Sequence, residues 1–253
     1  MSRRTMPLAV GWLLAALVIV GFCMLGNWQL HRASQKQAML ADAQQVLSRR
    51  VALPLTAAND AQRATRYDWS SGTVALLPTP VFLDNRIHEG RPGVQLYCLA
   101  RPSGQSFVML IDAGWLPLGD QRALPDVRCP TGAELTLRGL LAPPPAAGMT
   151  RWLASPTQQD QQRHLVTHID VRAIGARLAP GMAVAPRVLR LDPALRVGGL
   201  PADARRDLEI LPNTIPPQRH LGYAVQWFGL ALAVLITALL LSWRGRRARQ
   251  RAH

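Results

Sequence analysis

The stretch PLAVGWLLAALVIVGFCMLG, residues 7–26, contains no charged side chain. A second uncharged stretch, LGYAVQWFGLALAVLITALLLSW, covers residues 221–243. A helix rises about 1.5 Å per residue, so about 20 residues cross the roughly 30 Å hydrocarbon layer of a bilayer. A cleaved signal peptide is the alternative for the first stretch, but its apolar core is too long and no small-x-small cleavage site follows it. Both stretches are therefore predicted to be transmembrane helices.

The ends of the chain carry a concentrated positive charge. Of the 253 residues, 29 are Lys or Arg and 15 are Asp or Glu, which gives a formal net charge of +14. Half of that charge comes from arginines outside the apolar stretches: Arg3, Arg4, Arg244, Arg246, Arg247, Arg249 and Arg251. Basic residues flanking a span stay in the cytoplasm. The sequence thus predicts a cytoplasmic N-terminus (1–6), a basic cytoplasmic tail (244–253) and a periplasmic segment (27–219) in a bacterial inner membrane.

The segment between the spans holds all the acidic residues and no basic block with interleaved aromatics, so nucleic-acid binding is not expected. Its roughly 190 residues suffice for one compact domain. Residues 27–50 are rich in helix formers and predict an extension of the first helix. Within residues 71–192, short β-like runs begin near Gly72, Pro80, Gly93, Ser106, Glu134 and Arg187, and Asp170 is expected to cap a helix through VRAIGARL. The predicted fold class is an α+β membrane protein with two transmembrane helices flanking a mostly β periplasmic domain.

Three cysteines allow one disulfide in that domain. The periplasm is oxidising, so Cys98 and Cys129 can pair, or each can serve as a small buried apolar residue. Cys23 lies in the first span. The cysteine spacing does not match a metal-binding motif.

No pattern for catalysis is present. The sequence lacks a GxGxxG after a strand, a P-loop, HExxH, CxxC and GxSxG. His164 and His168 are spaced to share a helix face as metal ligands, but no third ligand is evident, and surface or capping histidines are the alternative. Asp112 and Glu89 are interpreted as isolated acids in loops or at strand ends. We expect no enzyme activity; the rival, a hydrolase using His164 or His168, requires a serine, cysteine or acidic partner beside them.

The boundary of the second span, QRHLGYAVQWF at residues 218–228, places unusual polar residues beside lipid. In a helix, His220, Tyr223 and Trp227 share a face, with Gln226 beside them. The predicted topology brings four residues of the first span to the same layer: Trp28, Gln29, His31 and Arg32. An interfacial aromatic belt is one interpretation. A haem site is the other, because a neutral imidazole is a common axial ligand of haem iron.

Four segments support a more specific interpretation. They are LGNWQLHRASQK (25–36), VFLDNRIHEGRPGV (81–94), LIDAGWLP (110–117) and NTIPPQRHLGYAVQWF (213–228). Together, in this order, they resemble the patterns LGxWQxxRxxxK, LDNRxxxGxxG, NRGWxP and HxxYAxQW of the Surfeit locus protein 1 family, membrane-bound assembly factors of cytochrome c oxidase. Asp112-Ala113 replaces the family's Asn-Arg pair, and Gly93-Val94 replaces a frequent Gly-Tyr.

The resemblance implies a chaperone that helps to insert or stabilise haem A in subunit 1 of the respiratory oxidase, alongside other assembly factors. His220 corresponds to the histidine to which haem A binding is attributed in bacterial members. The expected cofactor-binding set is His220 as ligand with Tyr223, Gln226, Trp227, Trp28, Gln29, Arg32 and Arg219; the arginines can meet propionates or lie at the lipid interface. Tyr223, Gln226 and Trp227 can instead dock on oxidase helices. A ligand-binding or scaffold module without haem is the alternative, and predicts a roomy apolar pocket inside the β domain.

Overall fold

The computed structural model describes residues 8–145, 159–160, 163–210 and 215–250. Arg3, Arg4, Asn213 and Arg251, which the sequence analysis used, lie outside these ranges. The chain divides into two compact units, one formed by residues 1–41 with 211–253 and the other by residues 42–210. We call the first unit the helix pair and the second the β domain.

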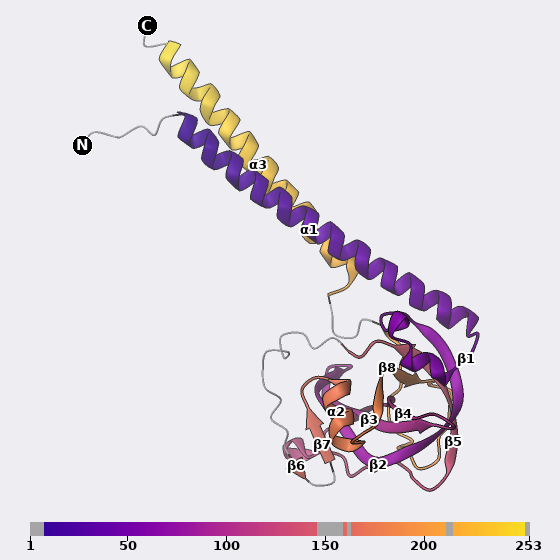
Figure 1. The fold of residues 1–253 in the computed structure, drawn as a ribbon. Helices are drawn as coiled ribbons and strands as arrows, with labels where there is room; N and C mark the ends of the chain where they lie inside the picture. The colour runs from indigo at the N-terminus through magenta and orange to yellow at the C-terminus, as the bar shows by residue number, and fades with distance from the viewer. Residues whose placement is uncertain (1–7, 146–158, 161–162, 211–214, 251–253) are drawn as a thin grey trace. The chain divides into compact units, whose positions relative to one another are not determined.

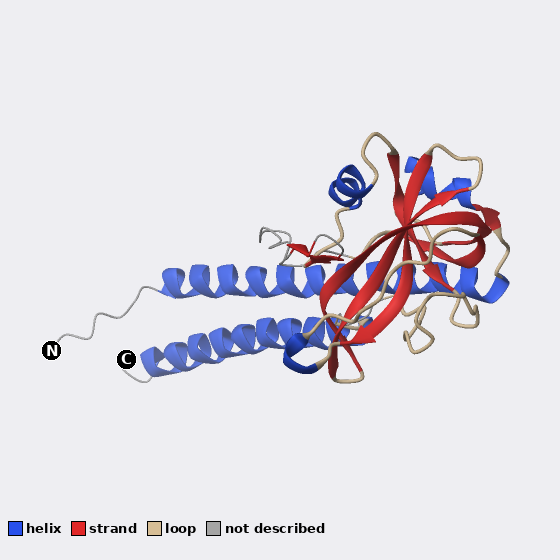
Figure 2. Ribbon diagram, turned by 90° about the horizontal axis from the view of Figure 1, so that it is seen from below, coloured by secondary structure: helices blue, strands red, loops and turns tan. Residues whose placement is uncertain are grey.

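The helix pair consists of α1 (Leu8–Arg49) and α3 (Pro217–Gln250), which lie side by side (Figures 1 and 2). In the described residues, these two helices are long and apolar enough to cross a membrane. With the mixed sheet that they flank in the sequence, they confirm the predicted fold class, an α+β chain with two spans.

The two helices contact each other along a regular stripe, which we call the seam. On α1 the more buried positions are Trp12, Ala15, Ile19, Phe22, Gly26, Gln29, Ala33 and Lys36. On α3 they are Pro217, His220, Ala224, Trp227, Ala231, Val234, Ala238 and Ser242. Steps of three and four residues alternate along α1 and along α3 up to Ala238, which is the spacing of a left-handed coiled coil. Small seam residues such as Gly26, Ala33 and Ala224 let the backbones approach closely, as expected for helices packing in lipid.

The β domain is built on one sheet of eight strands in the order β3-β4-β8-β5-β2-β7-β6, with β1 paired to β2. The strands are β1 (Leu53–Pro54), β2 (Asp68–His88), β3 (Arg91–Pro102), β4 (Phe107–Pro117), β5 (Glu134–Ala142), β6 (Gln159–Asp160), β7 (Arg163–Val166) and β8 (Ala183–Leu191). Since β2 also pairs with β3, the strands β2, β3, β4, β8 and β5 close into a barrel (Figure 2). The described part of the domain also contains four short helices: η1 (Leu55–Asn59), η2 (Ala61–Arg63), η3 (Asp120–Arg122) and α2 (Val171–Leu178).

The strand β2 joins two runs that the sequence suggested as separate strands, those starting at Gly72 and Pro80. Its register with β3 shifts between Leu76 and Pro80. Prolines lack the N–H that a ladder needs and are tolerated at such an irregularity. One long bulged strand therefore replaces the two predicted ones. The predicted helix α2 is confirmed, with the Asp170 side chain accepting from the backbone N–H of Arg172 and Ala173.

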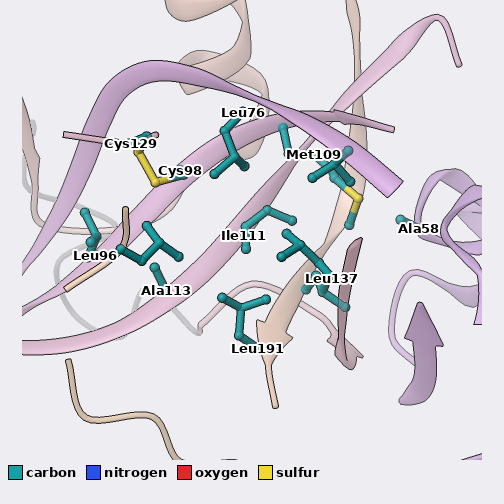
Figure 3. Close-up of a cluster of buried hydrophobic side chains, with 14 of the residues drawn as sticks. Ala58, Leu76, Leu96, Cys98, Met109, Ile111, Ala113, Cys129, Leu137 and Leu191 are labelled. Carbon is teal, nitrogen blue, oxygen red and sulfur yellow. A yellow bond between two sulfur atoms is a disulfide. The ribbon is translucent and has the colours of Figure 1, made fainter. Parts of the chain in front are cut away.

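Side chains fill the interior of the barrel (Figure 3). The cluster includes Leu76, Leu96, Met109, Ile111 and Leu137, all buried. A second cluster lies between the barrel wall and α2 and includes Leu99, Leu110 and Ile174. Strand β4 is buried from Phe107 to Leu116 because it faces both clusters.

A disulfide joins Cys98 in β3 to Cys129 in the segment between β4 and β5. Their Cα atoms are 5.9 Å apart and both residues are buried in the barrel cluster. Of the two alternatives from the sequence, the structure has the disulfide. Cys23 is free and exposed on α1.

A buried arginine ties the barrel to η1. The guanidinium of Arg187, on β8, is fully buried and donates to Asp68 Oδ2 of β2 at 2.5 Å and to the carbonyl oxygen of Ala57. Asp68 also accepts from Arg63. Burial acts to raise the pKa of Asp68, but the hydrogen bonds and charges of Arg63 and Arg187 outweigh it and lower that pKa below its ordinary value. Asp68 is thus ionised and neutralises a charge that water cannot reach.

Replacing Asp68 by Asn should destabilise the β domain by about 3–5 kcal/mol, because Arg187 is left buried without a counter-charge. Urea denaturation of the purified full chain in detergent, followed by circular dichroism, measures this. The control is Asp84→Asn, which removes an ion pair with Arg122 at the surface and should cost less than about 1 kcal/mol. Equal losses in the two variants would contradict the assigned role of Asp68.

The lowered pKa of Asp68 also predicts how the stability of the β domain changes at low pH. Because its pKa is lower in the folded state, its contribution is complete above the ordinary Asp pKa and is lost as pH falls through the folded-state value. In the Asp68→Asn variant the loss of stability below about pH 4 should therefore be shallower than in the wild type.

Removing the disulfide with the Cys98→Ala/Cys129→Ala double variant should cost about 3–4 kcal/mol of unfolding free energy, since the closed loop spans 31 residues. The measurement is again denaturation in detergent. Alkylation of the unreduced, denatured wild type followed by mass spectrometry provides the control, with modification expected at Cys23 alone. Alkylation of Cys98 or Cys129 in that sample would show that the bond is absent.

Candidate functional site

The most unusual residue of the helix pair is His220, whose side chain lies in the seam. It is 7% exposed, and its Nδ1 lies 2.7 Å from Oε1 of Gln29 on α1. The other ring nitrogen, Nε2, is buried and has no hydrogen-bond partner among the residues that the structure describes. An imidazole nitrogen left unpaired in an apolar surrounding is costly, so this position needs an explanation beyond packing.

Close packing surrounds this pair in the seam. A Cβ on Gly26 would lie 2.8 Å from the ring of Phe228. Glycine at this position therefore allows the Phe228 ring to pack directly against the backbone of α1. The rings of Phe22 and Trp227 are 5.5 Å apart. On the other side of Gln29, the ammonium of Lys36 donates to the carbonyl oxygen of Ile215 at 2.5 Å. The sequence analysis did not assign Lys36 a role, although its position in the heptad spacing was visible.

A second polar pair lies toward the other end of the seam, where the indole N–H of Trp12 donates to the hydroxyl of Ser242 at 3.0 Å. At roughly 1.5 Å per residue, the two polar pairs are about 26 Å apart along α1 and about 33 Å along α3. This separation is close to the thickness of a hydrocarbon layer. The seam between the pairs is apolar, so the two pairs fix the register of the helices.

The structure separates the predicted cofactor-binding residues into two groups. Gln29 and His220 meet in the seam, and Trp227 is half-buried there. The remaining members point away from it and are exposed: Trp28, Arg32, Arg219, Tyr223 and Gln226. Of these, Arg32 lies over the ring of Trp28, 5.8 Å from its centroid.

The predicted helix is present, and it places Tyr223 one turn after His220 but outside the seam. The seam advances from His220 to Ala224 and then to Trp227, and Tyr223 remains 42% exposed. Residues at i and i+3 are neighbours on a helix surface, but only one of them need face the partner helix.

The β domain contains a polar cluster that the sequence analysis missed. Asp112 was interpreted as an isolated acid, but it lies within β4, accepts from the Gln95 side chain at 2.6 Å and from the Gly114 N–H, and has Arg190 at 3.8 Å. Burial raises the pKa of Asp112, while the charge of Arg190 opposes the rise. Arg190 also pairs with Asp207. These contacts join strands β3, β4 and β8, and explain why a carboxylate is accommodated in a buried strand.

The two histidines proposed as metal ligands do not share a helix face. His164 lies in strand β7, and burial followed by the charge of Arg177 lowers its pKa. His168 follows that strand, and its Nδ1 is buried without a partner in the described part of the chain. In the part of the chain that the structure describes, no three His, Cys, Asp or Glu side chains lie close enough together to hold a metal ion.

One hollow of about 640 Å³ lies in the β domain, lined by residues 193 and 196–206. Its wall is the irregular segment after β8 and carries Arg196, Arg205 and Arg206. Three of its lining residues, Val197, Leu200 and Ala204, also pack in or against the core cluster of the barrel.

The burial of His220 is testable by chemical modification. Diethyl pyrocarbonate should modify the exposed His31 much faster than His220, since only His31 is accessible. Gly26→Leu should bring the rate at His220 toward that at His31, because a larger side chain displaces the ring of Phe228. Peptide mass spectrometry of the protein in detergent gives both rates.

The matched control is Gly222→Leu, because Gly222 faces open space and the new side chain meets nothing within 4 Å of its Cβ. His220 should stay protected in that variant. Equal rates at His31 and His220 in the wild type would contradict the buried position.

Comparison with known proteins agrees with this architecture. The sequence model of the SURF1 family matches residues 16–232, which include part of each span and the whole β domain. No individual curated protein matches the chain closely. The match covers far more than half of the chain and includes both halves of the Gln29–His220 pair, so the chain belongs to the SURF1 family.

Proposed function

We propose that this protein assists the assembly of cytochrome c oxidase by holding haem A, or stabilising the haem A centre of the catalytic subunit, at the Gln29–His220 end of the helix pair. The SURF1 family is one of cytochrome oxidase assembly factors rather than of enzymes, which supports the general role. The single observation that carries the haem proposal is the buried, unpartnered Nε2 of His220.

The residues at this position suit a haem. When bound, haem A supplies an iron that accepts the lone pair of a neutral imidazole nitrogen. His220 offers such a nitrogen and has its other ring nitrogen already occupied by Gln29, the arrangement usual for ligand histidines. Arg32 and Arg219 are exposed and near in sequence to Gln29 and His220, so their guanidinium groups are available to propionates.

Burial of Nε2 adds a condition to this proposal. The atom is covered by the helix pair itself, so iron cannot reach it unless neighbouring seam side chains move. A site that must open before it binds suits transient loading and release of a cofactor, because the closed pair competes with the haem. A permanent haem protein would instead keep its ligand exposed to the cofactor pocket.

The proposed topology places both termini in the cytoplasm and the β domain in the periplasm of a bacterial inner membrane. The exposed arginines Arg244, Arg246 and Arg247 at the end of α3 support it through the positive-inside rule. The disulfide of the β domain supports the same side, since such bonds persist in oxidising compartments.

Docking on a client is a second candidate role for this end of α3. Gln226 is exposed on an otherwise apolar helix, and an amide in lipid gains from a hydrogen bond to another helix. Tyr223 is exposed on the same helix. The proposed partners are helices of oxidase subunit 1, with other assembly factors beside them. Docking and haem holding are compatible, because a factor that hands over a cofactor must touch its client where the cofactor enters.

A ligand-binding or scaffold module without haem receives less support. That alternative predicts a roomy apolar pocket in the β domain. The barrel interior is instead packed with buried side chains, and the hollow lined by residues 193 and 196–206 carries arginines on its wall.

The test is the visible spectrum of the detergent-purified protein from cells that synthesise haem A. The wild type should carry the haem A spectrum, and His220→Ala should lose it. His31→Ala should keep it, because His31 is exposed at the same end of α1 and does not lie in the seam.

A wild type without haem A, in cells whose oxidase activity falls when the gene is deleted, would overturn the haem proposal and leave the docking role. A spectrum that persists in His220→Ala would assign the ligand to another residue.

A further inference from the structure

The hydrogen bond between Gln29 and His220 has a defined direction. The oxygen Oε1 of Gln29, which lies 2.7 Å from Nδ1, can only accept. The proton of a neutral imidazole must therefore be on Nδ1 for the contact to be a hydrogen bond. Nε2 then carries a lone pair and no proton, which fits its lack of an acceptor among the described residues.

The reverse arrangement is less favourable here. If the amide were turned so that its NH₂ donated to Nδ1, the ring proton would move to Nε2. That N–H would be buried with no acceptor in the described part of the chain, and buried N–H groups without a partner are rarer in proteins than buried acceptors without one. A histidine side chain in water favours the proton on Nε2, so the seam selects the opposite tautomer.

We infer that Gln29 is a positioning residue for His220: it holds the ring proton on Nδ1 and so presents the lone pair of Nε2 as a ready metal ligand. This inference rests on the proposed function for its purpose, but the tautomer is a property of the protein without haem. This role also explains why Gln29, a polar residue, occupies a seam position on α1, whereas the seam positions before and after it are the small residues Gly26 and Ala33.

Gln29 lies on α1 and His220 on α3. The ring proton of His220 is therefore held on Nδ1 only while the two helices are packed together at this level. The orientation of the ring is fixed in the same way, because Nδ1 is held at one point. A haem that reaches Nε2 therefore meets a nitrogen in the correct protonation state, without a proton having to leave a buried site.

The decisive measurement is nitrogen-15 NMR of histidine-labelled protein in detergent, without haem, at a pH where the ring is neutral. The His220 resonances, assigned by their loss in His220→Ala, should show a protonated Nδ1 and an unprotonated Nε2. In Gln29→Leu this pattern should be lost, with the proton distributed toward Nε2. Gln35→Leu is the matched control, since Gln35 is an exposed glutamine on the same helix, and should leave the His220 resonances unchanged.

Haem A titration supplies the second readout. Gln29→Leu should weaken haem A binding by about 10- to 100-fold, the usual effect of removing the partner of a ligand histidine. Gln29→Glu should restore much of the affinity, because it keeps an oxygen acceptor of the same reach.

The outcomes separate the two proposals. A wild-type His220 with its proton on Nε2, or a tautomer unaffected by Gln29→Leu, overturns the role of Gln29 even if the protein binds haem A. A protonated Nδ1 that depends on Gln29 supports that role even if no haem A is bound, in which case the proposed function fails by itself.

Discussion

A histidine enclosed between two apolar helices must have a hydrogen-bond partner, and this requirement organises the helix pair. Gln29 provides that partner from the other helix, with its Oε1 2.7 Å from Nδ1 of His220. The bond fixes which residues face each other at one end of the pair, as the bond from Trp12 to Ser242 does at the other. Between them only apolar and small side chains pack, which alone would specify the register weakly.

The β domain is stabilised by a different set of interactions. Its barrel is closed by strand pairing and filled by apolar side chains, and the disulfide from Cys98 to Cys129 holds the segment between β4 and β5 against it. The ion pair of Arg187 with Asp68 fixes η1 to the barrel from inside. The interior of the barrel is thus occupied by the side chains of the core cluster.

The family resemblance and the structure contribute separate information about function. The match to the SURF1 family gives the process, oxidase assembly, but names no residue. Within the described part of the helix pair, the structure singles out His220, because its unpartnered nitrogen differs from an interfacial side chain that water could solvate. Where the chain departs from the family pattern at Asp112, the buried contacts with Gln95 and Arg190 give the carboxylate a local structural role.

The sequence by itself determined the two spans and the strand-rich segment between them, because long apolar runs and short β patterns are local properties. It also indicated that Gln29 and His220 lie at the same level of the helix pair, and the contact between them agrees with this. It did not determine that β2 is one bulged strand, that Asp112 is buried, that Tyr223 faces outward or that the two cysteines are bonded. Each of these depends on which distant segments meet. Two polar residues 191 positions apart become one hydrogen-bonded pair only when α1 and α3 pack, and tertiary structure alone decided that.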